Sequence, residues 1–257
     1  MSSGDLLGLS GQAFLVLFMV FLRIGSAMAF LPALGESPVP VRIRLVLALA
    51  LTLVVAPAVA PLFAERPGTA SGLLLGAAGE VLFGLAAGLA LRLMIIALQV
   101  AGAIAAQSTS LSQVFGGMIA DPQPAFGKIL TVAGLALFVL LKLHVAVVAY
   151  LIQTYHLLPP WNLLAGPELI PWGLSEIARA FRLGFVLAGP FVAASLIYNV
   201  ALGAINRAMP QLMVSFVGAP AITAGGLVLL ALASPGMMSV WAGAVSRIAA
   251  NPFGASP

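Results

Sequence analysis

The sequence contains no cysteine and very few charged side chains. Without cysteine, the chain can form no disulfide, no thiolate metal site and no cysteine nucleophile. Only 7% of its 257 residues are charged, whereas a soluble domain carries about 25%. The 11 Lys or Arg and 7 Asp or Glu residues are too few to cover a water-facing surface. The composition therefore excludes an ordinary soluble enzyme.

Long apolar runs take the place of the missing charges. Hydrophobic residues make up 62% of the chain, and the mean hydropathy is +1.15. A membrane-spanning helix needs about 20 apolar residues, and these runs are apolar at consecutive positions rather than alternating as in a membrane barrel. We predict an all-α polytopic integral membrane protein with about six long helices in one domain, residues 1–257. The runs are 8–33, 43–64, 69–105, 127–153, 180–205 and 211–234, with a shorter piece near 237–250.

Prolines indicate that several of these helices are broken or paired as hairpins. Pro57 and Pro61 predict a kink or an early end in the second run, and Pro190 predicts the same in the fifth. Lys and Arg are shared almost equally between alternating connections, so the positive-inside rule gives no orientation. Ala27-Met28-Ala29 has the pattern of a signal-peptide cleavage site, but no basic region precedes it. We expect the first run to be a retained helix.

The third run carries small residues at every fourth position. Such spacing keeps residues on one flank of a helix, and glycines there let another backbone approach closely. We expect this flank to pack against protein, with the Glu80 carboxylate inside the contact. The residues are Gly72, Gly76, Glu80, Gly84 and Gly88.

Several kinds of chemistry lack the residues they need. Ser10 lies in a Gly-x-Ser-Gly pattern, but His144 and His156 are the only histidines and neither is a plausible base for it, so we interpret Ser10 as a helix cap or loop residue. Metal-ligand spacing and a phosphate-binding GK[ST] loop are both absent from the sequence. No basic patch could neutralise several phosphates of a nucleic acid. We expect no catalytic residue, no cofactor, no metal and no nucleic-acid partner.

A small-solute or proton-coupled carrier stays open as an alternative. Such carriers use carboxylates inside membrane helices, and Glu80 lies deep in an apolar run. Carriers also show repeat symmetry between their halves, which is not evident in this sequence.

A polar stretch after the third run, residues 107–122, is the most distinctive loop. It combines hydroxyl side chains and a glycine pair with isolated bulky residues, which suits a loop that lines or fills a cavity inside a membrane protein. An ordinary exposed connection is the alternative. The residues that would form such a plug are Gln107, Ser108, Leu111, Val114, Phe115, Gly116, Gly117, Met118, Asp121 and Pro122.

Motifs spread over nearly the whole chain resemble the flagellar biosynthetic protein FliR family. The most specific is the Asn-x-Ala-Leu-Gly…Arg-x-x-Pro-Gln…Gly-x-Pro pattern between Asn199 and Pro220. Lys142 and Ala219 depart from the family's usual residues. The residues that match are Arg23, Pro32, His144, Asn199, Gly203, Arg207, Pro210, Gln211, Gly218 and Pro220.

The resemblance implies a non-enzymatic subunit of the type III export gate, in the bacterial inner membrane at the flagellar basal body and partly toward the periplasmic side. Its partners would be the two smaller export-gate membrane subunits, the other flagellar export membrane proteins, membrane lipid and unfolded flagellar substrates. The 107–122 loop would be the plug that closes the pore at rest. The motif around Arg207 is interpreted as a chain corner with a helix-end charge rather than as pore lining. A gate subunit of a virulence injectisome is the nearest alternative.

Overall fold

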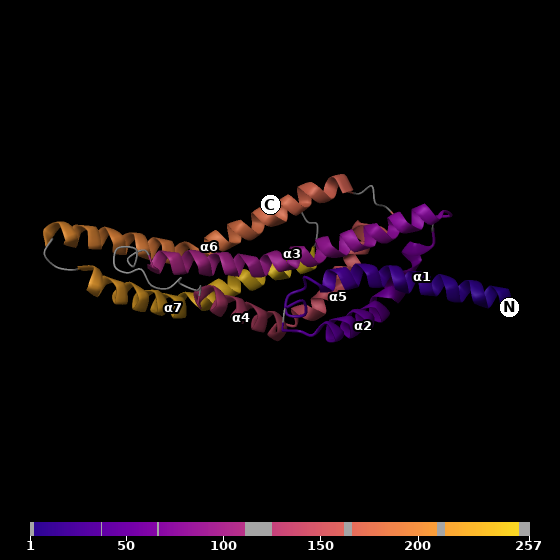
Figure 1. Ribbon diagram of the computed structural model, residues 1–257, viewed down its shortest axis with the longest axis horizontal. Coiled ribbons are helices and arrows are strands. Elements are labelled where there is room, and N and C mark those ends of the chain that lie inside the picture. The colour runs from indigo at the N-terminus through magenta and orange to yellow at the C-terminus, as the bar shows by residue number, and fades with distance from the viewer. Residues whose placement is uncertain are drawn as a thin grey trace. The chain divides into compact units, whose positions relative to one another are not determined.

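The computed structural model describes residues 3–36, 38–65, 67–110, 125–161, 166–209 and 214–251. Within these residues the chain is helical and contains no strand (Figure 1). The all-α fold class predicted from the sequence is therefore confirmed. The helices are α1 (Ser3–Met28), α2 (Val41–Val59), the 3-10 turn η1 (Ala60–Phe63), α3 (Ala70–Ser110), α4 (Ala125–Leu140), α5 (Leu143–Leu157), α6 (Gly166–Ala208) and α7 (Val214–Ala250).

The number of long apolar helices agrees with the prediction of about six. In the described part of the chain, five helices are long and apolar enough to cross a membrane, and the α4–α5 pair makes a sixth if it counts as one broken span. This architecture defines a polytopic membrane protein, because lipid cannot satisfy backbone polar groups that lie outside helices.

The predicted break between residues 234 and 237 is wrong, and one break was missed. The run 127–153 is not continuous, because α4 and α5 meet at a sharp bend where Lys142 adopts a left-handed conformation (φ 56°). The runs 211–234 and 237–250 form the single helix α7, which continues through Pro235. Helix α6 continues past Pro190, so of the predicted kink or early end only the early end is excluded. In the second run, α2 ends at Val59, two residues after Pro57, and becomes a 3-10 turn.

The described chain divides into two compact units, which are considered separately. Unit 1 comprises residues 1–93, 138–177 and 244–257, and unit 2 comprises residues 94–137 and 178–243. In unit 1, α2 packs on α1 and also contacts α5. The Tyr150 hydroxyl donates a 2.9 Å hydrogen bond to the Ala87 carbonyl oxygen, which joins α5 to α3. Phe63 packs edge-on against Trp161, with 5.7 Å between ring centroids.

Unit 2 is organised around Trp241, which is fully buried. Its indole Nε1 donates a 2.8 Å hydrogen bond to the Met94 carbonyl oxygen, joining α7 to α3. Gly134 of α4 lies against the same ring. Phe126 and Phe191 pack 5.9 Å apart and connect α4 with α6. Aromatic contacts of this kind fix the register of otherwise featureless apolar helices.

Large apolar side chains also cover much of the outer surface. Phe14, Val41, Leu196 and Leu232 are each at least 65% exposed. Isolated apolar residues are common on soluble proteins, but extended apolar faces indicate a membrane or a partner. The outside of these helices is therefore suited to lipid or to other membrane helices.

Candidate functional site

The most elaborate polar cluster is centred on Arg23 of α1, inside unit 1. Val16, Val20, Arg23 and Ala27 recur at helical spacing and are all buried, so Arg23 lies on the inward face of the helix. Its guanidinium Nε donates to Glu80 Oε2 of α3 at 2.7 Å, and Nη2 donates to Glu80 Oε1 at 3.0 Å. Both oxygens of the carboxylate are thus held by one planar guanidinium, the arrangement that Arg forms best.

The remaining guanidinium donors face the end of α5. Nη2 also donates to the Leu158 carbonyl oxygen at 2.9 Å, and Nη1 approaches Thr154 Oγ1 at 3.5 Å. The Tyr155 ring lies 3.7 Å from the Arg23 Cζ atom, measured to the ring centroid. A buried charge is tolerated only when it is paired and hydrogen-bonded. The cluster therefore ties α1, α3 and α5 together through one side chain.

Two of the glycines predicted to line the third helix make room for this cluster. A Cβ at Gly84 would collide with the Arg23 carbonyl oxygen, and a Cβ at Gly88 would lie 3.0 Å from the Ala27 Cα. At these positions the backbones of α1 and α3 are in direct contact, as small-xxx-small packing requires.

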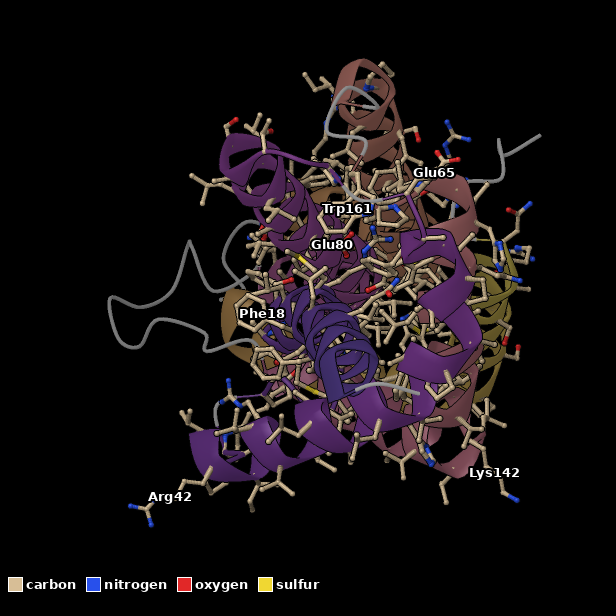
Figure 2. All side chains as sticks on the ribbon, turned by 90° about the vertical axis from the view of Figure 1, so that its right-hand side faces the viewer. Phe18, Arg42, Glu65, Glu80, Lys142 and Trp161 are labelled. Atoms are coloured by element: carbon tan, nitrogen blue, oxygen red, sulfur yellow. The ribbon has the colours of Figure 1, made fainter. Side chains whose placement is uncertain are left out.

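The other two predicted glycines have different neighbours. Gly76 faces the ring of Trp161, whereas Gly72 faces Pro67 just before its own helix. Glu80 is 1% exposed and lies inside the protein contact (Figure 2). The row is therefore not one continuous helix interface, because its first turn meets only the preceding loop.

A second ion pair joins Arg92 of α3 to Glu36, in the connection between α1 and α2. It is partly exposed, and Pro32 in the same connection is buried. The sequence reasoning named Pro32 from the family motif but did not predict the Arg92–Glu36 pair.

The polar stretch proposed as a plug is only partly within the described residues. Gln107 and Ser108 belong to α3, which continues to Ser110, so the loop does not begin at 107 as expected. Gln107 is exposed, whereas Ser108 is buried and its hydroxyl donates to the Ile104 carbonyl oxygen at 2.8 Å. This hydrogen bond satisfies the buried hydroxyl within the helix. Leu111, Val114, Phe115, Gly116, Gly117, Met118, Asp121 and Pro122 lie outside the described residues.

The remaining motif residues occupy several helices. His144 is exposed on α5, Asn199 is half-buried on α6, and Arg207 is exposed in the last turn of α6. A side chain at Gly203 of α6 would meet no atom within 4 Å. Gly218 and Pro220 belong to α7, and Pro210 and Gln211 lie outside the described residues. Among the described residues, no three His, Asp or Glu side chains are grouped as a metal site would require.

The pairing of Arg23 with Glu80 was missed at the sequence level. We placed Glu80 in a protein contact but did not identify its partner. A usable signal exists, because Arg23 and Glu80 are charges of opposite sign inside apolar runs, and such charges pair with one another in membranes. Thr154 and the Leu158 carbonyl are uncharged, so the sequence gives no indication that they contact Arg23.

Comparison with known proteins identifies the family of this polytopic membrane protein. The family described as bacterial export proteins, family 1, matches residues 14–248. The flagellar biosynthetic protein FliR of Caulobacter vibrioides is 33% identical over 225 residues, which cover 87% of this chain and 90% of that protein. The FliR protein of Escherichia coli K12 is 29% identical over 231 residues, covering 85% and 84%. That of Aquifex aeolicus is 34% identical over 165 residues, covering 62% of each.

The chain belongs to the FliR family of bacterial export proteins. It is therefore a membrane component of flagellar biosynthesis and export. The apolar helices and the family together indicate the inner membrane.

Proposed function

We propose that the chain is a structural, non-enzymatic channel subunit of the flagellar type III export gate. In this role it forms part of the gated pore through which unfolded flagellar proteins cross the inner membrane at the basal body. Its membership of the FliR family over nearly its whole length carries the proposal. Its partners are the two smaller membrane subunits of the gate and the other flagellar export membrane proteins, with part of the assembly toward the periplasm.

The end of α6 supports a role inside an assembly. Among the described residues, almost every one from Val200 to Met209 is exposed, on every face of this part of the helix. It includes Asn206 and Arg207, which are costly to place against lipid tails. A partner protein that packs around this end would satisfy both its polar and its apolar side chains.

A deletion of the gene in the source bacterium, complemented in trans, tests the proposal directly. We expect loss of motility and loss of flagellin and hook protein from the medium, both restored by the gene. If the deleted cells swim and export flagellin normally, and the genome contains no second copy, the flagellar role is wrong. Loss of effector secretion with intact motility would favour an injectisome gate.

The proposed plug at 107–122 requires a separate test. A photo-crosslinking amino acid at Met118 should form an adduct with an export substrate that is stalled by a fused, tightly folded domain. The control position is Leu74, which lies on α3 and is 73% exposed. Adducts at Leu74 but not at Met118 would contradict the pore assignment of the loop.

The carrier alternative makes a different prediction for Glu80. A coupling carboxylate has to exchange protons or ions, whereas both Glu80 oxygens are bound by Arg23. If Glu80 is structural, replacing both residues by Met should preserve export better than Glu80→Gln alone, because it leaves no unpaired charge. If Glu80 couples transport, the double variant should be as inactive as the single one.

A further inference from the structure

An apolar groove lies between α1 and α2 in unit 1, with a volume of about 390 Å³. One wall is a single face of α2, formed by Val41, Arg44, Leu45 and Ala48 at helical spacing. The other wall is the last two turns of α1, and Val81 of α3 also lines the groove. The α1 residues are Phe21, Leu22, Gly25, Ser26 and Met28, and Ala29 follows directly after the helix.

The groove runs along the first two turns of α2. Residues 41–48 extend about 10 Å along α2 at 1.5 Å per residue. Apart from Ser26 and Arg44 the residues that line it are apolar, so its wall suits a hydrocarbon chain.

One end of the groove carries uncompensated positive charge. Arg44 lines the groove and donates to the Val39 and Glu36 carbonyl oxygens at 3.1 and 3.0 Å, so neutral groups hold its guanidinium. Arg42, in the same turn, is exposed and projects away from the helices (Figure 2). It makes no hydrogen bond or ion pair with any described residue. The nearby Glu36 carboxylate is already paired with Arg92.

The first turn of α2 adds to this positive end. It has no acidic residue, and its N-cap residue Pro40 provides no side-chain cap. Free backbone N–H groups at a helix N-terminus attract anions. The positive charge thus lies next to the apolar wall. An amphiphile with an anionic headgroup and a hydrocarbon chain could contact both.

We propose that this groove binds one acyl chain of an anionic phospholipid, with the phosphate at Arg44 and the start of α2, where the exposed Arg42 adds positive charge. Apolar burial holds the chain between Gly25 and Ala48, and the two arginines select the charged headgroup. The bound lipid fills the space between α1 and α2. This role depends on the chain being a membrane protein and not on the proposed gate function.

The test uses the purified full-length chain in detergent, with native mass spectrometry of bound lipid. Dioleoyl phosphatidylglycerol is the anionic probe, and dioleoyl phosphatidylcholine is its zwitterionic match. We expect wild-type protein to retain phosphatidylglycerol about tenfold better than phosphatidylcholine. Arg44→Gln should remove most of this preference, and Arg42→Gln should weaken it. Lys142→Gln, which removes an exposed cation at a different place in unit 1 (Figure 2), should leave it unchanged.

Filling the groove tests the site itself. Gly25→Leu should abolish retention of both lipids, because a Cβ at this position makes only ordinary contacts with Phe21 and the rest of the side chain enters the groove. Gly11→Leu is the matched control, since Gly11 lies on the same helix and faces open space. Unchanged retention in Gly25→Leu, or equal loss in Gly11→Leu, would overturn the proposal. Loss of a copurifying subunit with lipid retention unchanged would also overturn it and assign the groove to a protein partner.

Discussion

Arg23 is stable inside unit 1 because its guanidinium meets a carboxylate, a carbonyl oxygen and an aromatic ring. Glu80 binds two of its nitrogens, and the Leu158 carbonyl oxygen accepts from one of them. Removing a single member of such a buried pair leaves an unpaired charge, which costs more than removing the whole pair. The cluster is therefore sensitive to single substitutions and tolerant of double ones.

We expect Glu80→Gln to lower the free energy of unfolding by about 3 kcal/mol. The glutamine retains the size of the side chain but leaves the Arg23 charge without a counter-ion. Thermal unfolding of the purified protein in one detergent measures the loss. The double variant Arg23→Met/Glu80→Met should lose less than the sum of the two single variants.

The partly exposed pair provides the control for this prediction. The Arg92 and Glu36 side chains are 26% and 20% exposed, so Glu36→Gln should cost at most about 1 kcal/mol. If both variants lost the same free energy of unfolding, burial would not be what makes the Arg23–Glu80 pair more stabilising than the Arg92–Glu36 pair.

At the scale of helices, close backbone packing decides how α1 and α3 fit together. Gly84 lies against the Arg23 carbonyl oxygen, in the same turn that positions Glu80. The interface and the ion pair thus depend on each other. A side chain at Gly84 would push apart the two helices that the ion pair joins.

We expect Gly84→Ala to destabilise the protein by about 1–3 kcal/mol, because its Cβ meets backbone that cannot move aside. Gly189→Ala on α6 is the control, because a Cβ at Gly189 would meet no atom within 4 Å. It should be neutral or stabilise by up to about 1 kcal/mol through helix propensity. Thermal unfolding of both variants gives the comparison, and a neutral Gly84→Ala would contradict close packing of α1 on α3.

The sequence predicted which segments are helices better than where they break. Apolar runs identify membrane helices because lipid admits few other backbone structures. The break at Lys142 was missed because Leu and Lys are good helix formers, and only the left-handed backbone there ends the helix. The false break at Pro235 arose because proline ends most soluble helices, whereas membrane helices tolerate it. The partners of Arg23 depend on tertiary packing, which local patterns do not determine.

For the molecule as a whole, uncovered surface is the feature that favours an assembly. The C-terminal end of α6 presents apolar and polar residues on all sides. A helix end of this kind suits a protein environment better than lipid tails. The proposed gate subunits are the natural candidates to surround it.

A photo-crosslinking amino acid at Ile205 tests this expectation in cells that contain the complete export apparatus. Ile205 is 43% exposed, so we expect a protein adduct whose mass corresponds to a gate subunit. Phe191, on the same helix but 1% exposed, is the control and should react only within the chain. Lipid adducts alone at Ile205 would place this end of α6 against the bilayer instead.

The Arg23 cluster also sets an order of events during biogenesis. Glu80 lies 57 residues after Arg23, and Leu158 lies 135 residues after it. At roughly 5–20 residues per second of synthesis, the guanidinium waits several seconds for its counter-ion and longer for its last acceptor. During this interval its long side chain has to reach the headgroup region. We therefore expect α1 to reach its final depth only after α5 has been made, and a chain truncated before α5 to present an unpaired charge in its first helix.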